Sequence, residues 1–171
     1  MATPRILTFN FHEPYLCLMA ETDLPIDVGV YEHGPLARAW HAQFRPAPTN
    51  LTFIREAAWR ERLASGYYDV VIAQNESNAM DVARAEAARL LICHNRRTFL
   101  KTTIRSDNEN GQAAYEEVLD TLAERFEFIY ISESKRADYG LPGRVIPPGF
   151  DVEAWGGYTG EVPCANRVGN T

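Results

Sequence analysis

The sequence predicts one α/β domain in which helices cover both faces of a mostly parallel sheet, the arrangement called doubly wound. The first observation is that short, almost wholly apolar runs alternate with segments of helical character along the chain. Such runs are typical of parallel strands that are buried on both faces. The second observation is size, because 171 residues, of which 46% are hydrophobic, suit a single domain with a substantial core.

The predicted strands are the short apolar runs themselves. The clearest of them has the sequence YDVVIA, and the weakest is LTFI. In chain order, strands are expected at Arg5–Phe9, Ile26–Tyr31, Leu51–Ile54, Tyr68–Ala73, Leu90–Cys93, Phe128–Ile131 and Arg144–Ile146.

The predicted helices lie between these strands, at Pro14–Ala20, Arg55–Ser65, Ser77–Arg89 and Gln112–Phe126. Pro14 lies in a first turn, where a helix tolerates proline, and Gly66 can end the second helix. The third segment is rich in alanine and is expected to be a helix or a helical turn. The fourth carries a single apolar helix face, formed by Tyr115, Val118, Leu119, Leu122 and Phe126.

The composition excludes several functional classes. The 23 acidic residues outnumber the 17 basic ones, which argues against nucleic acid as the main partner. No apolar run is long enough to span a membrane, and no signal peptide is recognisable, so a cytoplasmic protein without a transmembrane segment is expected. Cys17, Cys93 and Cys164 form no Cys-x-x-Cys pair and are expected to be reduced thiols.

Several catalytic motifs are missing from the sequence. It contains no Gly-x-Gly-x-x-Gly turn, which disfavours a dinucleotide-dependent oxidoreductase. The hydrolase motif Gly-x-Ser-x-Gly, the zinc motif His-Glu-x-x-His and the P-loop are also missing. No Asp-x-Asp pair occurs, so the sequence indicates no Mg²⁺ requirement. No other metal site and no cofactor are expected.

The candidate site is expected at the carboxyl ends of the strands, where doubly wound sheets bind ligands. The first strand is followed by Asn10, His12, Glu13 and Tyr15. Their amide, imidazole, carboxylate and phenol groups suit hydrogen bonding to a polyhydroxylated ligand. The alternative is that Asn10 and His12 only cap the helix that begins near Pro14.

His94 follows the fifth strand and is the candidate catalytic residue. At that position an imidazole can donate a hydrogen bond to a phosphate or sugar oxygen. A purely structural histidine is an equally open alternative. Asn95 is a candidate ligand-binding residue, and Arg96 and Arg97 either neutralise phosphate charge or face solvent.

Two further strand ends carry polar residues with competing interpretations. The fourth strand precedes the segment QNESN, in which Asn75 is a candidate ligand-binding residue and Ser77 or Asn78 a candidate helix N-cap. The sixth strand precedes Ser132 and Glu133, which suit the N-cap and the first turn of a following helix.

The order of several short motifs resembles glycosyl transferase family four, nucleotide-sugar glycosyltransferases of the GT-B architecture. The segment IYISES, which ends at Ser134, is similar to a strand end of that family. RVIPPGFD, at residues 144–151, is similar to the family's v-I-P-n-G-v-D motif and is followed by the aromatic Trp155. YDVVI and LLICH, which ends at His94, match two earlier strands of the family in the same order.

This resemblance covers about Arg5–Trp155 and has three departures. Pro148 stands where the family usually has asparagine, and Phe150 where it usually has valine. The glycine pair that often follows the family's first strand is replaced by Asn10–Phe11–His12.

The resemblance implies the Rossmann-like N-terminal half of a GT-B enzyme. Residues 1–150 would bind the acceptor, and residues 151–171 would be a linker and the start of a missing C-terminal domain that binds the donor. Such an enzyme moves a sugar, with retention, from a nucleotide-diphosphate sugar to a sugar or glycan acceptor. The 171 residues alone are expected to be inactive, and the full-length enzyme could be peripheral to the inner membrane.

The resemblance also assigns roles by position. His94 matches the histidine near the donor sugar, and residues 147–151 would be the structural crossing into the second domain. The residues that would face the donor phosphate, the acceptor or the cleft are Asn10, His12, Glu13, Tyr15, Ser132 and Glu133. Two alternatives remain: a stand-alone α/β module that binds a carbohydrate or a protein without catalysis, and half of a sugar-nucleotide epimerase.

Overall fold

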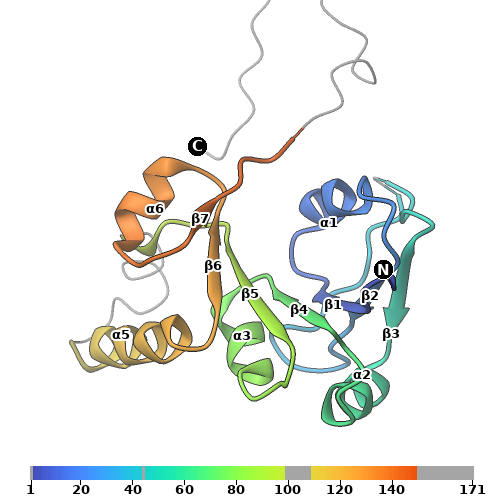
Figure 1. Ribbon diagram of the computed structural model, residues 1–171, viewed down its shortest axis with the longest axis horizontal. Helices are drawn as coiled ribbons and strands as arrows, with labels where there is room; N and C mark the ends of the chain where they lie inside the picture. Colours follow the sequence, from blue (N-terminus) through green and yellow to red (C-terminus); the bar gives the residue numbers. More distant parts are fainter. Residues whose placement is uncertain (1, 44, 99–108, 150–171) are drawn as a thin grey trace, which may run out of the picture.

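The computed structural model describes residues 2–43, 45–98 and 109–149 and contains one seven-stranded sheet (Figure 1). The strands lie in the order β3-β2-β1-β4-β5-β6-β7, and every neighbouring pair is parallel. The predicted α/β class is confirmed, and the sheet, expected to be mostly parallel, is parallel at each of these pairings. The strands are β1 Ile6–Phe9, β2 Ile26–Gly29, β3 Leu51–Ile54, β4 Val70–Ala73, β5 Ala88–Cys93, β6 Glu127–Tyr130 and β7 Arg144–Val145.

Local sequence signals set the ends of several helices. His12, Asn75 and Ser132 are N-caps whose side chains accept hydrogen bonds from backbone N–H groups of the first turn. α6 ends at Gly140, whose φ of 66° lies in the left-handed region that glycine adopts without strain. The helices are α1 Glu13–Ala20, α2 Glu56–Ala64, α3 Glu76–Val82, α5 Glu109–Ala123 and α6 Glu133–Tyr139.

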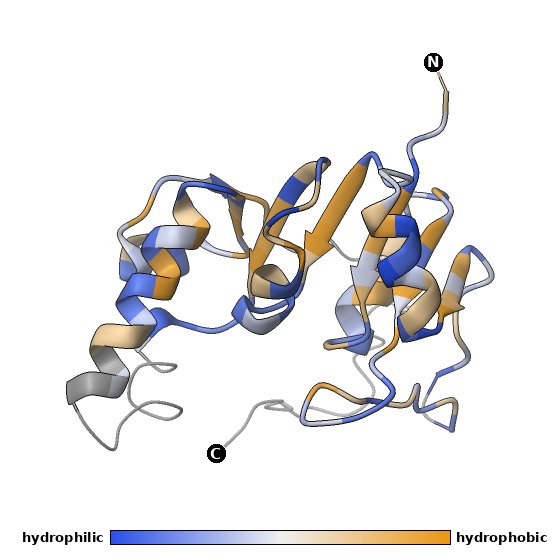
Figure 2. Ribbon diagram, turned by 90° about the horizontal axis from the view of Figure 1, so that it is seen from below, coloured by the Kyte–Doolittle hydropathy of each residue, from blue (hydrophilic) through white to orange (hydrophobic). Residues whose placement is uncertain are grey.

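Two apolar cores lie on opposite faces of the sheet, because successive residues of a strand point to opposite sides. Ile6 packs with Leu16 of α1 in one core. Its neighbour Leu7 belongs to the other core, together with Trp59 of α2 and Leu119 of α5. Figure 1 shows α1 on one side of the sheet and α2, α3 and α5 on the opposite side. Figure 2 shows that hydrophobic residues dominate the strands between them, as a doubly wound fold requires.

The predicted helix at Ser77–Arg89 is wrong in its second half. α3 ends at Val82, and β5 already begins at Ala88. The backbone N–H of Ala88 donates to Asp69 O at 3.0 Å, and Ala88 pairs with Val70 of β4. Alanine favours a helix in isolation, but pairing with the neighbouring strand overrides that preference here. The other predicted strands and helices are present. The strand Leu51–Ile54 has the predicted bounds, and the remaining elements begin or end one to three residues away from the prediction.

Some of the predictions lie outside the described residues. These are the linker and second-domain start at residues 151–171, and the end of the RVIPPGFD motif with the aromatic residue after it. Within the described ranges, no helix combines the length and the apolar character that a membrane span needs.

The winding direction of the sheet reverses between β1 and β4, since β1 pairs with β2 on one side and with β4 on the other. This strand order is that of Rossmann-like folds, which bind ligands at the carboxyl edge beside the reversal. The segments that follow β1, β4 and β5 begin with Asn10, Gln74 and His94. These three segments therefore start at the edge where a ligand is expected.

Candidate functional site

His94 lies at the centre of a cluster of side chains at this edge. Its Nε2 lies 2.7 Å from Oε1 of Gln74. Its half-buried ring stacks on the ring of His12, with the centroids 5.0 Å apart and the planes 13° from parallel. Tyr15 meets the same imidazole edge-on, at 4.8 Å between centroids. The structure therefore brings together three of the predicted site residues, His12, Tyr15 and His94.

Gln74 links His94 to the interior of the sheet. Its Nε2 donates to Thr8 Oγ1 at 2.9 Å, and the Thr8 hydroxyl donates to Ile72 O at 2.9 Å. The same Gln74 nitrogen lies 3.5 Å from Met19 Sδ of α1. Gln74 is 1% exposed and Thr8 is fully buried, so both polar side chains are sequestered and hydrogen-bonded.

Both imidazoles of the stack are neutral at physiological pH. The pKa of His94 is lowered from its usual 6.5 to about 4, chiefly by burial, with smaller electrostatic contributions from the neighbouring His12 and Lys135. The pKa of His12 is also lowered, chiefly by the loss of solvent around its ring. A neutral imidazole carries one donor and one acceptor nitrogen, so this pair can bind an uncharged polar group without counter-ions.

Asn10 and Glu13 hold the β2–β3 connection rather than contacting His94. The buried Asn10 side chain donates from Nδ2 to Arg38 O at 3.2 Å. Glu13 Oε1 accepts from the backbone N–H of His41 at 3.0 Å and lies 2.8 Å from His41 Nδ1. The capping alternative is therefore confirmed for His12, whose Nδ1 accepts from the backbone N–H at position 15, but not for Asn10.

Asn75 and Ser132 act as helix caps. Asn75 Oδ1 accepts from the Asn78 N–H at 2.8 Å, so Asn75 is the N-cap of α3 and the prediction of Ser77 or Asn78 is wrong. The Asn75 Nδ2 atom is buried and has no hydrogen-bond partner among the described residues. Ser132 Oγ accepts from the backbone N–H of the third α6 residue at 3.4 Å, as its sequence position predicted.

The remaining candidates lie at the protein surface or hold α6. Asn95 is exposed. Glu133 is exposed and pairs with Arg136 at 2.9 Å. Arg96 is exposed, whereas Arg97 donates to Tyr139 O at 2.6 Å and forms an ion pair with a carboxylate of α5. Arg97 thus joins helices rather than facing solvent.

A second polar cluster lies on the face of the sheet opposite α1. Glu76 Oε1 accepts hydrogen bonds from Tyr115 OH at 3.1 Å and from Tyr139 OH at 3.2 Å. Burial raises the pKa of both phenols, so they remain donors at physiological pH. These bonds join α3, α5 and α6, which gives the cluster a structural role. No group of side chains suited to a metal ion occurs among the described residues.

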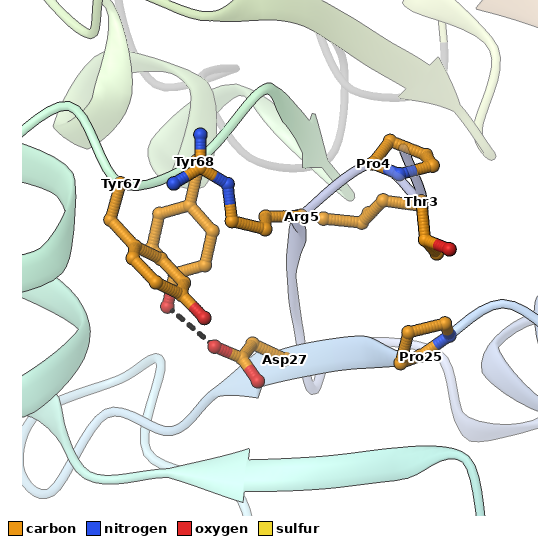
Figure 3. Close-up of a pocket in the computed structure, with 8 residues that line it drawn as sticks. Thr3, Pro4, Arg5, Pro25, Asp27, Tyr67 and Tyr68 are labelled. Atoms are coloured by element: carbon orange, nitrogen blue, oxygen red, sulfur yellow. Dashed lines mark hydrogen bonds between the residues drawn. The ribbon is translucent and has the colours of Figure 1, made fainter. Parts of the chain in front are cut away.

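A cavity of about 120 Å³ lies at the opposite, amino-terminal edge of the sheet (Figure 3). Asp27 on its wall accepts hydrogen bonds from Arg62 at 2.6 Å and from Tyr68 OH at 2.9 Å. Arg5 pairs with Asp69 at 2.8 Å. The charged groups around this cavity thus neutralise one another, and the cavity is far from His94.

Gln74 and Thr8 are the site residues that the sequence predictions missed. Gln74 is the first residue of the QNESN segment, in which the sequence indicates Asn75, and not Gln74, as the ligand-binding residue. Thr8 is a hydroxyl in an otherwise apolar strand, ILTF, which is the sequence signal that could have identified it. A buried polar residue in such a run needs a partner, and here that partner is Gln74.

Comparisons with protein-family models, curated proteins and solved structures found no match to this chain.

Proposed function

We propose that this chain is the acceptor-side domain of a nucleotide-sugar glycosyltransferase, with the imidazoles of His94 and His12 binding sugar hydroxyls. The observation that carries the proposal is a neutral imidazole stack at the carboxyl ends of β1 and β5, next to the reversal point of the sheet. Rossmann-like folds bind nucleotides and their derivatives at this edge. The resemblance of the sequence motifs to glycosyl transferase family four supports the same function.

The chemistry assigns a limited role to this domain. Transfer from a nucleotide-diphosphate sugar requires stabilisation of the charge that develops on the leaving phosphate. The proposed second domain would supply most of that stabilisation. His94 would hold the sugar through a hydrogen bond, and losing such a bond in a desolvated site costs about 1–3 kcal/mol. This cost corresponds to a decrease of roughly tenfold to a hundredfold in kcat/KM.

The proposal is tested by offering a panel of nucleotide-diphosphate sugars and simple glycan acceptors to the protein expressed from its complete reading frame. Residues 1–171 are assayed in parallel. We expect transfer by the complete protein and none by residues 1–171. Transfer by the 171 residues alone would contradict the proposed division between two domains.

Other outcomes would favour the alternatives. Conversion of the nucleotide sugar without any acceptor would indicate an epimerase. Sugar binding without turnover by the complete protein would indicate a non-catalytic module. Absence of both binding and turnover across the panel would refute the proposed function.

A further inference from the structure

We propose that Thr8 and Gln74 are positioning residues that hold His94 as the Nε2–H tautomer, so that its remaining nitrogen, Nδ1, accepts a hydrogen bond from a ligand hydroxyl. A proton-free anionic oxygen cannot donate to that nitrogen. The tautomer follows from hydrogen bonds within the chain alone. The assignment of the ligand hydroxyl to a sugar rests on the proposed function.

The single hydroxyl proton of Thr8 is committed to one hydrogen bond. Thr8 Oγ1 lies 2.9 Å from Ile72 O, and a carbonyl oxygen can only accept. The hydroxyl proton is therefore used in this bond. Thr8 Oγ1 can therefore act only as an acceptor towards the Gln74 amide, whose Nε2 lies 2.9 Å away.

This requirement fixes the orientation of the Gln74 amide. The amide nitrogen must face Thr8. In this orientation it also lies 3.5 Å from Met19 Sδ, which is a weak hydrogen-bond acceptor. The reversed amide would place Oε1 against the Thr8 oxygen, with no proton between them. Oε1 therefore faces His94 Nε2 at 2.7 Å, and that nitrogen must carry the proton.

The ligand-side chemistry of the stack follows from this assignment. A neutral imidazole has one N–H, so Nδ1 of His94 keeps a lone pair, and it makes no hydrogen bond to the described residues. Nδ1 of His12 accepts from the backbone N–H of Tyr15 at 3.3 Å, which leaves the proton of neutral His12 on Nε2. The two stacked rings thus offer one acceptor and one donor, the complement of a hydroxyl group. The low pKa of His94, about 4, keeps this arrangement neutral at physiological pH.

Nitrogen-15 NMR of histidine-labelled protein tests the tautomer directly, since protonated and unprotonated ring nitrogens differ in chemical shift. At pH 7 we expect only Nε2–H for His94 in the wild-type protein and in Thr8→Ser, which retains the hydroxyl. Thr8→Val removes the hydroxyl at nearly constant volume, frees the amide to reverse, and should add a measurable Nδ1–H population. Gln74→Met should also lose the single tautomer, and it provides a second test if Thr8→Val does not fold.

Two results would overturn the positioning role. One is an Nδ1–H tautomer in the wild-type protein. The other is an unchanged single tautomer in both Thr8→Val and Gln74→Met. Neither result depends on transferase activity, so a failure of the proposed function leaves the tautomer measurement intact.

The ligand class is tested on the same samples with two kinds of probe. Neutral monosaccharides, namely glucose, galactose, mannose and N-acetylglucosamine, can donate to Nδ1, whereas sulfate carries no proton. We expect at least one monosaccharide to shift the His94 Nδ1 signal, with an apparent affinity about tenfold weaker in Thr8→Val than in Thr8→Ser. A shift of Nδ1 by sulfate but by none of the sugars would refute the hydroxyl assignment.

Discussion

The half-buried imidazole of His94 should make the stability of the fold depend on pH between about 4 and 6.5. Its pKa is about 4 in the folded protein against a usual value of 6.5. Because the folded pKa is the lower one, the unfolded chain binds the proton more tightly. The folded state is therefore fully favoured above pH 6.5 and loses stability as the pH falls towards 4.

The size of this effect follows from the two pKa values. Full protonation of His94 would cost about 3 kcal/mol, at about 1.4 kcal/mol for each pH unit between the two values. At pH 5 the unfolded chain is almost fully protonated at this position and the folded one is not, so about 2 kcal/mol of the cost is already present. This is a large fraction of the stability of a typical domain, about 5–15 kcal/mol.

Urea denaturation at pH 7 and pH 5 measures this loss. His94→Gln removes the titrating group and keeps a polar side chain, so its free energy of unfolding should fall by about 2 kcal/mol less between the two pH values than that of the wild-type protein. His33→Gln, at an exposed position, should retain the wild-type pH dependence. The same pH dependence in the wild-type protein and in His94→Gln would refute the reasoning.

Three further substitutions test the packing of α5, α6 and β6 by their effect on the free energy of unfolding. Tyr139→Phe removes one of the two phenol donors to Glu76 and should lower the free energy of unfolding by about 1–3 kcal/mol. Tyr67→Phe, at an exposed phenol, should lower it little. Equal losses in the two variants would contradict the structural role of the Glu76 cluster. Leu119→Ala, at a fully buried position, should cost about 2–5 kcal/mol, and a change below about 1 kcal/mol would show that α5 is not packed as described. Gly143→Ala would place Cβ 2.4 Å from Phe128 O and should lower the free energy of unfolding by about 1–3 kcal/mol. The Cβ of Gly149→Ala would meet no atom within 4 Å, so this variant is the control. Equal stabilities of the two variants would refute the close approach of Gly143 to β6.

The fold was predictable from the sequence because the strands are short runs in which apolar residues predominate. Runs such as VVIA in β4 have no polar face, and only a sheet covered on both sides buries them fully. The Ala-rich segment before β5 was not predictable, because its helical preference is opposed by hydrogen bonds to β4. Strand pairing is a long-range property that composition does not reveal.

The site was predictable in its location and only partly in its residues. The rule that ligands bind at strand ends places His12 and His94 at one edge of the sheet, although they are far apart in the chain. The partner of His94 depends on the register of three adjacent strands, which sets Gln74 between Thr8 and His94. Glu76 receives donors from positions 39 and 63 residues further along the chain, which no local pattern could indicate.

The central claim, that the His94 imidazole holds the transferred sugar, is tested most directly by the kcat/KM of sugar transfer for His94→Ala in the complete protein. His33→Ala, at an exposed position outside the candidate site, is the matched control. We predict that His94→Ala lowers kcat/KM by about tenfold to a hundredfold, with His33→Ala unchanged and both variants folded at pH 7. Equal kcat/KM values for His94→Ala and the wild-type protein would contradict the claim.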